Sequence, residues 1–576
     1  MVYLNLSFVT TFEMLTSELT IFTNPMKTLL LALGLIVLSI PCSGQIAEAK
    51  AIDEVFTTLI SPQSPGASLG VFKDGQLVYG KGYGLANMEY DIPNDTQSVF
   101  RIGSTSKQFT AACVVLLAQQ GKLSLEDPLS KHFPEFPDYA DRITIRQLMN
   151  HTSGIRDYLQ ISYLRGMSED DFYTDQEIMR WLVNQTDLNF EPGSEFTYSN
   201  SGYWLLGQLV NKVSGKNMAQ FAQAEIFEPL GMTATHFHND HQAIVKNRAS
   251  GYAPTTDGGY QISMTTLDMI GDGGIFTSIE DILKWDNEYY ERKLLNDAFW
   301  KEMTTTGKLS NGEDTEYGGG LFMEEYKGLR TISHGGAFVG FRAELLRFPD
   351  QKVSVAIFAN RGDANPSTMA QEIADIILKD QFKDLPSEAV AEVENPPMDE
   401  AEMELDQLVG TYEVEPGVEV VFSISNDSLH AKQKWNGSEY NLYRETGNRF
   451  KMKGQDGLSF TFTDLKDGLA QELTVMQGNR PTQVKRKEEK DLSGVNPNDY
   501  IGTYFSPELE VNYIFELKDG QLVARVGNGE EHNCTLSDVD IYTGRMGTYR
   551  FQRTIGQVSG MELDSGRVIN VKFEKK

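Results

Sequence analysis

The chain has 576 residues, of which 40% are hydrophobic and 23% are charged, and its formal net charge is −30 at pH 7. This composition is that of a globular protein, so it excludes a chain that is disordered or embedded in a membrane over most of its length. The excess of acidic residues excludes nucleic acid and anionic membrane surfaces as partners, because binding to phosphate requires basic patches. A chain this long exceeds one ordinary core, and we expect roughly three or four structural units.

Residues 1–44 are predicted to form an N-terminal extension and a signal peptide. In the segment MKTLLLALGLIVLSIPCSGQ, one lysine precedes an apolar run that is too short for a comfortable transmembrane helix, and small residues follow the run. The residues before Met26 contain no basic side chain, which indicates that translation starts at Met26. We therefore expect an exported protein, periplasmic or secreted. We expect membrane contact only through a lipid anchor at Cys42. Pro41 directly before this cysteine disfavours such an anchor.

Residues 50–380 are predicted to form one α+β domain. An opening helix (AIDEVFTTLI) is followed by a hairpin with Asp74-Gly75 at its turn. Helices and loops fill the middle, and strands return in LRTISHGG and AELLRFPDQKVSVAIFAN before a last helix. Because the first and last segments would supply strands of a single sheet with a helical insertion between them, the pattern is typical of an α+β fold.

Two small all-β domains are predicted after this domain. An acidic linker that contains proline occupies residues 381–403. The segment LDQLVGTYEV around Gly410 is then echoed by NDYIGTYFSP around Gly502, and each copy ends on a basic strand, TQVKRK or INVKFEKK. The repeat predicts two barrel-like domains, residues 404–490 and 495–576. We expect them to support or bind, because neither carries a cluster of catalytic side chains.

A lone cation stands at the start of an otherwise apolar helix. In FRIGSTSKQFTAACVVLLAQQG, Lys107 is the one charged residue after Ile102. Positions i and i+3 share a helix face, so the amine of Lys107 is expected to lie against the hydroxyl of Ser104, where a desolvated amine can act as a general base. The alternative is structural: the serines and the threonine cap the helix, and Lys107 extends from its end to solvent.

A histidine-rich loop offers a competing site that depends on metal. Residues His236 to His241 read HFHNDH, and the H-x-H-x-D-H spacing is the one with which metallo-β-lactamase-type hydrolases hold zinc. The run follows a predicted helix end and turn rather than an apolar strand, and two of the three later histidines fall in the β repeats. We therefore expect a solvated polar loop and a reaction without metal or cofactor, with metal binding at His236, His238 and His241 as the alternative.

Two further motifs place polar groups at the ends of elements. In EFTYSNSGYWLLG, Tyr198 and Asn200 are two residues apart, so their side chains point the same way if the stretch is extended. The structural alternative is a helix start, with Asn200 or Ser201 as its cap. His334-Gly335-Gly336 ends a predicted strand, where glycines let a substrate approach the backbone, although a bulge or turn shows the same pattern.

Together these motifs resemble those of the penicillin-recognising serine hydrolases, which include class C β-lactamases, DD-peptidases, D-aminopeptidases and family VIII esterases. ITIRQLMNHTSGI and GDGGIFTSIEDILKW are also similar to stretches that recur in this family, and the resemblance covers about residues 50–380. It implies a serine β-lactamase-like domain, and the two predicted barrels are similar to the domains appended in D-aminopeptidases. The three motifs, in chain order, are Ser104-x-x-Lys107, Tyr198-x-Asn200 and His334-x-Gly336.

The resemblance implies a covalent mechanism. Ser104 would attack a carbonyl carbon and form an acyl-enzyme, while Lys107, Tyr198 or both accept its proton. The backbone N–H groups of Ser104 and Ala337 would bind the oxyanion, and Asn200 would orient Lys107 and the acyl side chain. The substrate-binding residues that the resemblance implies are Asn200, His334, Gly335, Gly336 and Ala337.

One residue departs from the pattern of β-lactamases and most DD-peptidases. Their third motif begins with lysine, whereas this chain has His334, which weakens recognition of a substrate carboxylate near neutral pH. We expect protonation at lower pH to restore that contact in part. Arg342 is a second candidate for it, with a surface salt bridge as the structural alternative for this arginine.

These residues lead to an expected function. We expect an exported serine hydrolase of small amides or esters, with D-amino-acid peptides or esters preferred to penicillins as substrates. A β-lactamase or DD-carboxypeptidase is the alternative. An inactive protein that binds peptide or glycan is the alternative from another class.

Overall fold

The computed structural model describes residues 47–168, 171–382, 402–415, 418–425, 427–434, 438–452, 455–477, 480–487 and 491–576. The predicted signal peptide and nearly all of the predicted linker lie outside the described residues. Within the described ranges, no helix combines the length and the apolar character that a membrane span requires.

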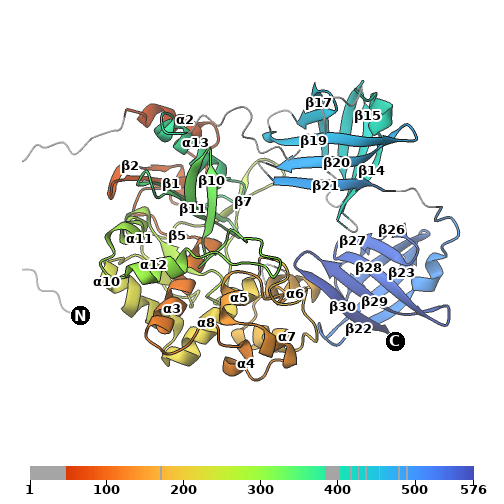
Figure 1. Ribbon diagram of the computed structural model, residues 1–576, viewed down its shortest axis with the longest axis horizontal. Helices are drawn as coiled ribbons and strands as arrows, with labels where there is room; N and C mark the ends of the chain where they lie inside the picture. Colours follow the sequence, from red (N-terminus) through yellow and green to blue (C-terminus); the bar gives the residue numbers. More distant parts are fainter. Residues whose placement is uncertain are drawn as a thin grey trace, which may run out of the picture. The chain divides into compact units, whose positions relative to one another are not determined.

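A six-stranded antiparallel sheet forms the centre of the first domain (Figure 1). Its order, β10-β11-β12-β13-β1-β2, places the N-terminal hairpin beside strands from the end of the domain, as the sequence predicts. At the turn of this hairpin, Asp74 and Gly75 adopt φ values of 49° and 80°, which a two-residue hairpin loop requires. The strands are β1 (Ala67–Lys73), β2 (Gln76–Tyr83), β10 (Phe322–Tyr326), β11 (Leu329–Phe338), β12 (Phe341–Phe348) and β13 (Val353–Ala359).

Helices cover this sheet and fill the middle of the domain. Helix α13 packs on β12 and β13, and α11 packs on β1 and β13, so β13 is buried along its whole length. The helices are α2 (Ala49–Thr57), η1 (Gly103–Ser106), α3 (Lys107–Gln119), α4 (Leu129–His132), η2 (Asp138–Arg142), α5 (Ile145–Met149), α6 (Tyr158–Leu164), α7 (Asp175–Val183), α8 (Asn200–Ser214), α9 (Met218–Ala222), η3 (Gln223–Phe227), α10 (Glu228–Leu230), α11 (Ile279–Glu291), α12 (Asp297–Met303) and α13 (Pro366–Leu378). Short strands join them: β3 (Leu85–Asn87), β4 (Ile92–Pro93), β5 (Phe100–Arg101), β6 (His236–Phe237), β7 (Tyr252–Pro254), β8 (Tyr260–Ile262) and β9 (Ile275–Thr277).

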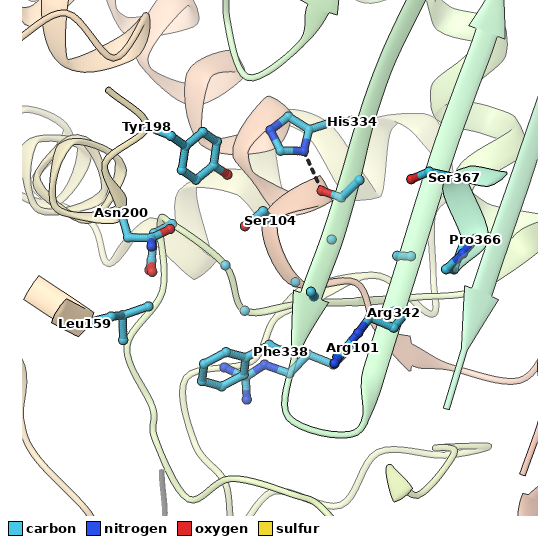
Figure 2. Close-up of a pocket in the computed structure, with 18 of the residues that line it drawn as sticks. Arg101, Ser104, Leu159, Tyr198, Asn200, His334, Phe338, Arg342, Pro366 and Ser367 are labelled. Carbon is cyan, nitrogen blue, oxygen red and sulfur yellow. Dashed lines mark hydrogen bonds between the residues drawn. The ribbon is translucent and has the colours of Figure 1, made fainter. Parts of the chain in front are cut away.

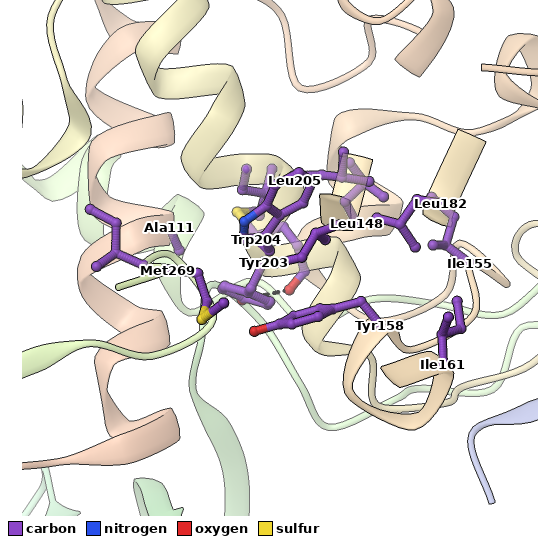
Figure 3. Packing of buried hydrophobic residues seen from close by; sticks show 14 of the residues in the cluster. Ala111, Leu148, Ile155, Tyr158, Ile161, Leu182, Tyr203, Trp204, Leu205 and Met269 are labelled. Atoms are coloured by element: carbon purple, nitrogen blue, oxygen red, sulfur yellow. Dashed lines mark hydrogen bonds between the residues drawn. The ribbon is translucent and has the colours of Figure 1, made fainter. Parts of the chain in front are cut away.

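The core of the helical part is built around α3 and α8. Every residue of α3 from Lys107 to Val115 is buried, so the helix has no solvated face over that length. From α8, Tyr203 and Trp204 pack with Tyr158 and other large apolar side chains (Figure 3). Burial of one such side chain contributes roughly 1.5–3 kcal/mol, so this packing holds the N-terminal ends of α3 and α8 in place.

Two β-barrels follow, as predicted. The first is closed, and its interior is filled by its own aromatic side chains, among them Tyr412, Phe422 and Phe462. The second is a nine-stranded sheet whose two edge strands, β25 and β26, are separated only by Cys534, so the sheet curls until its edges nearly meet.

The first barrel contains α14 (Leu405–Leu408), β14 (Gly410–Glu415), β15 (Val418–Ser425), β16 (Ser428–Gln433), β17 (Glu439–Thr446), β18 (Arg449–Met452), β19 (Gln455–Lys466), β20 (Leu469–Gln477) and β21 (Arg480–Arg486). The second contains η4 (Pro497–Tyr500), β22 (Gly502–Ser506), β23 (Val511–Lys518), β24 (Gln521–Val526), β25 (His532–Asn533), β26 (Thr535–Asp538), β27 (Ile541–Gly544), β28 (Gly547–Thr554), β29 (Gln557–Ser565) and β30 (Val568–Lys575).

The sequence repeat has a structural counterpart. Gly410 and Gly502 begin β14 and β22 with nearly equal φ values of 148° and 147°. Two residues later, Tyr412 and Tyr504 donate hydrogen bonds to carbonyl oxygens four residues before them, at 3.3 and 2.9 Å. The basic strands β21 and β30 pair with β14 and β22. The two copies therefore start and close in the same way.

The second barrel packs against the helical part of the first domain. Its buried aromatic residues belong to the same hydrophobic cluster as the core around α3 and α8. Arg156, just before α6, pairs with Glu508 of the barrel at 3.0 Å, and their side chains are only 0% and 4% exposed. The hydroxyl of Tyr513 donates to the carbonyl oxygen of Leu164, at the end of α6. These contacts fix the barrel against α6 at both ends.

Candidate active site

Ser104 and Lys107 lie one turn apart at the start of α3. The Nζ atom of Lys107 is 3.2 Å from Oγ of Ser104, as the spacing predicts, and Lys107 is 0% exposed, so it does not extend to solvent. Nζ also donates to Oδ1 of Asn200 (2.8 Å) and to the carbonyl oxygen of Asp272 (2.6 Å). Because these two oxygens only accept, they occupy two of the three positions on the nitrogen, and the third is directed at Ser104.

The segment with Tyr198 and Asn200 meets this pair from the start of α8. The Tyr198 ring lies 4.8 Å from Nζ of Lys107, and its buried hydroxyl has no hydrogen-bond partner among the described residues. A helix does start here, as the structural alternative has it, but its cap is Ser199, whose Oγ accepts a backbone N–H at 3.4 Å, and not Asn200 or Ser201. Ser199 has the extended backbone that a cap needs, and the side chain of Asn200 is left to face Lys107.

The third motif brings β11 against the turn that carries Ser104. A Cβ atom on Gly336 would lie 2.0 Å from the carbonyl oxygen of Ile102, so only glycine permits this approach. The hydroxyl of Thr105 donates to the carbonyl oxygen of His334 at 3.1 Å. The strand and the turn are therefore in direct contact, at Gly336 and through the side chain of Thr105.

The N–H group of Ala337 is directed away from β12. Phe338 and Phe341 close the two-residue hairpin between β11 and β12, and Ala337 belongs to the next pair. Hydrogen-bonded and non-hydrogen-bonded pairs alternate along such a ladder, so this N–H faces the opposite side, where β10 pairs only with the first half of β11. A Cβ atom on Gly103 would lie 2.8 Å from this nitrogen. The Ala337 nitrogen therefore lies beside the turn that carries Ser104.

His334 is neutral and hydrogen-bonded within the protein. Its Nδ1 lies 2.6 Å from the carbonyl oxygen of Gly335 and its Nε2 lies 2.9 Å from the hydroxyl of Tyr317. A carbonyl oxygen only accepts, so Nδ1 carries the proton and Nε2 accepts from Tyr317. Burial, together with the charge of Lys107, lowers the pKa of His334 to about 3. The expectation that mildly acidic pH protonates His334 is therefore wrong.

Several buried groups behind the motifs were missed by sequence reasoning. His151 adopts a φ of 62°, its Nδ1 accepts the N–H of Ser199 at 3.1 Å, and its ring centre lies 4.2 Å from that of Tyr198. Asp157 accepts from Nδ2 of Asn200 at 2.9 Å. His151 and Asp157 lie in and just after the string ITIRQLMNHTSGI, which signalled the family but not their individual roles.

Asp272 was missed in the same way. It lies in the string GDGGIFTSIEDILKW, and its Oδ2 accepts from the hydroxyl of Tyr158 at 2.9 Å while its carbonyl oxygen accepts from Lys107. Burial raises the pKa of the Asp272 carboxyl group. This residue therefore holds Lys107 through its backbone and Tyr158 through its side chain.

Ser104 and the residues of the second and third motifs line one cavity of about 640 Å³ (Figure 2). Tyr198, Asn200, His334 and Ser104 surround one part of it, and Phe338 lies toward another part together with two arginines. The predicted site residues that line the cavity are Ser104, Tyr198, Asn200, His334, Gly335, Gly336 and Ala337. Lys107 lies behind them in the protein interior.

The HFHNDH segment is not the solvated loop that the sequence predicts, because His236 and Phe237 form β6 and His238 is only 5% exposed. His236 stacks on Phe276, and its Nε2 lies 3.1 Å from Nδ1 of His238. His241 pairs with Asp268 at 2.9 Å. Among the described residues, no group of three or more His, Cys, Asp or Glu side chains is arranged to hold a metal ion.

Comparison with known proteins places these observations in a family. A family model described as Beta-lactamase matches residues 50–377. The chain is 27% identical to a D-aminopeptidase of Gluconobacter oxydans (strain 621H) over 310 residues, which are 54% of this chain and 58% of that protein. It is 28% identical to penicillin-binding protein 4* of Bacillus subtilis (strain 168) over 397 residues, 66% of this chain and 86% of that protein. It is 27% identical to a D-aminopeptidase of Brucella anthropi over 462 residues, 80% and 82% of the two chains.

The alignment covers little more than half of the length of the first of these relatives. Among solved structures, the octameric penicillin-binding protein homologue from Pyrococcus abyssi matches with a TM-score of 0.53 and 24% identity, covering 76% of this chain and 98% of that one. At this identity the likeness concerns the fold. The family match includes all three motifs and more than half of the residues. The chain therefore belongs to the beta-lactamase family, among the penicillin-recognising serine hydrolases.

Proposed function

We propose that this protein is a serine acyl-hydrolase with Ser104 as its nucleophile. The observation that carries the proposal is the short contact between Oγ of Ser104 and Nζ of Lys107. Two acceptors hold two positions of that nitrogen, so its third position faces the serine hydroxyl, and after loss of a proton the amine has its lone pair there. Lys107 can then take the proton as Oγ attacks a carbonyl carbon.

The remaining steps use groups that line the cavity. The backbone N–H groups of Ser104 and Ala337 donate hydrogen bonds to the oxyanion of the tetrahedral intermediate. As the bond from the carbonyl carbon to the leaving group breaks, a proton passes from Lys107 to the leaving nitrogen or oxygen. The unpartnered hydroxyl of Tyr198 is placed to relay it. Water then attacks the carbonyl carbon of the acyl-enzyme and gives a proton to Lys107 or Tyr198. The bond from that carbon to Oγ of Ser104 breaks, and the proton passes to Oγ.

For the substrate we propose small amides or esters, with D-amino-acid peptides or esters ahead of penicillins. Two relatives named D-aminopeptidase support D-amino-acid peptides as substrates. The neutral state of His334 supports the lower rank of penicillins, because the third motif offers no fixed cation to a penicillin carboxylate. We also propose export, on the basis of the predicted signal peptide.

Covalent labelling tests the proposal. A fluorophosphonate probe should label the purified protein, and peptide mapping should place the adduct on Ser104. Ser104→Ala should remove labelling and ester hydrolysis. Ser106→Ala is the matched control, because this serine lies in the same turn but its Oγ accepts the N–H of Ile275 instead of facing the cavity. A full label in Ser104→Ala would overturn the proposal, and an unlabelled wild type would favour an inactive binding protein.

A further inference from the structure

The second barrel contributes a side chain to the catalytic cavity. Arg567, at the tip of the hairpin between β29 and β30, lines the same cavity as Ser104. Its guanidinium lies 4.9 Å from the centre of the Tyr198 ring, and its side chain remains 46% exposed. A cation from the second barrel thus lies at the edge of the site.

The backbone of this hairpin tip is anchored to the first domain. The carbonyl oxygen of Arg567 accepts from Nδ2 of Asn189 at 2.9 Å, and the side chain of Asn189 in turn accepts the N–H of Ile569 at 3.1 Å. Beside it, Gln160 of α6 donates to the hydroxyl of Ser565 at 2.8 Å. Since the backbone is held on both sides of Arg567, the position from which its guanidinium reaches the cavity is defined.

The nearest carboxylate leaves the charge of Arg567 only partly balanced. Asp157 lies 3.7 Å from the guanidinium and is 2% exposed. Its Oδ2 accepts from the backbone N–H and the side chain of Asn200 at 2.7 and 2.9 Å, and its Oδ1 accepts from the N–H groups of Leu159 and Gln160 at 3.0 and 3.2 Å. These four donors already satisfy Asp157. Arg567 therefore retains donors for a group that enters the cavity.

The rest of the cavity has the same sign of charge. Its lining contains Arg101 and Arg342 as well as Arg567, and the one carboxyl group among its lining residues is the buried Asp272. Arg101 is 6% exposed, and its Nε has no hydrogen-bond partner among the described residues. Arg342 donates to two backbone carbonyl oxygens, so it is held in place beside the hairpin turn.

We propose that Arg567 is a specificity residue that binds an anionic group of the substrate. The proposal rests on the proposed acyl-hydrolase function: among the amides and esters proposed above, it favours those with a carboxylate or similar anion within reach of the second barrel. A bond from arginine to a carboxylate is charge-assisted and often bidentate, and contributes about ten-fold or more in binding. It gives the second barrel a role in substrate selection, not only in support.

Three esters of equal chain length test the charge preference: the p-nitrophenyl esters of hexanoate (neutral), adipate as its monoester (anionic) and 6-aminohexanoate (cationic). For the wild type, kcat/KM should be at least about ten-fold higher for the adipate ester than for the hexanoate ester. The preference for adipate should decrease as salt is added, because exposed charges are screened.

Substitutions then assign the preference to one side chain. Arg567→Gln should lower kcat/KM for the adipate ester about ten-fold more than for the hexanoate ester, and Arg567→Glu should favour the amino ester. Lys572→Gln is the matched control, because Lys572 lies on the same hairpin and pairs with Asp187 outside the cavity, so the order of the three esters should not change.

Two results would overturn the proposal. The first is a wild type without charge preference. The second is an equal loss for all three esters in Arg567→Gln, which would make Arg567 a positioning residue for Tyr198 and Asp157. Fluorophosphonate labelling keeps the two proposals separate. A labelled wild type without charge preference refutes only the role of Arg567, whereas absence of labelling refutes both.

Discussion

Acid should destabilise the protein through His334, and the structure sets the sign and the size of the effect. The imidazole is buried, its Nδ1–H donates to Gly335 and its Nε2 accepts from Tyr317, so only the neutral form fits. Its pKa is lowered to about 3 from an ordinary value of 6.5. The folded state therefore binds fewer protons than the unfolded state between these values. The stability contributed by neutral His334 is complete above pH 6.5 and is lost as the pH falls toward 3.

One pKa unit corresponds to 1.36 kcal/mol, so His334 should cost about 2 kcal/mol of unfolding free energy between pH 8 and pH 5. His334→Gln removes the titration. The difference in unfolding free energy between the variant and the wild type should therefore shift by this amount in favour of the variant as the pH falls. Other buried groups, such as His151, whose pKa burial also lowers, titrate in both proteins and cancel in the difference.

Urea unfolding followed by tryptophan fluorescence measures this difference. Trp181, Trp204, Trp285 and Trp300 are buried in the first domain, so the signal reports on the domain that holds His334. A difference between the two proteins that stays constant from pH 8 to pH 5 would refute the neutral, buried assignment. The same assignment predicts that the ratio of kcat/KM for nitrocefin and p-nitrophenyl butyrate does not rise through protonation of His334 over this pH range.

Three further predictions concern other parts of the molecule. Lys107→Met should lower kcat/KM for a neutral ester by about 10²–10⁴-fold, the range of a general base, and a variant within ten-fold of the wild type would exclude Lys107 from proton transfer. Dialysis against a chelator, and replacement of both His236 and His238 by alanine, should leave ester turnover unchanged; a loss that zinc restores would make HFHNDH a metal site after all. Glu508→Gln should lower the unfolding free energy of the docked barrel by about 3–5 kcal/mol, because it leaves Arg156 buried without its anion, and calorimetry showing no change in Tm would contradict that.

Local chemistry explains what the sequence could predict. Asp74-Gly75 predicts a hairpin because the turn needs positive φ, and the spacing of Ser104 and Lys107 predicts their contact because a helical turn brings i and i+3 together. The repeated Gly-Thr-Tyr segments predict two similar barrels, because each tyrosine makes the same local contact with the chain before it. Each of these features is decided within a few residues.

Long-range packing explains what the sequence could not predict. Asp157 and Arg567 are far apart in sequence and meet because the second barrel packs against α6, where Arg156 pairs with Glu508. From the sequence alone, His334 suggests a titratable contact with substrate. The structure shows that its Nε2 accepts from the buried hydroxyl of Tyr317, which fits a neutral ring. The environment of a side chain decides its charge, and the environment is assembled from distant segments.

The amide of Asn200 shows how these segments act together. Its oxygen lies 2.8 Å from the amine of Lys107 and its nitrogen lies 2.9 Å from Asp157, so the amide dipole is aligned between a cation and an anion. Aspartate at position 200 would place a second carboxylate against Asp157. The two carboxylates would repel each other, and from the barrel the partly exposed Arg567 is the cation beside them. Glutamine would be too long to keep both contacts. The polar order Lys107, Asn200, Asp157, Arg567 therefore runs from the nucleophile to the second barrel, and the position of the amine beside Ser104 depends on contacts that both domains supply.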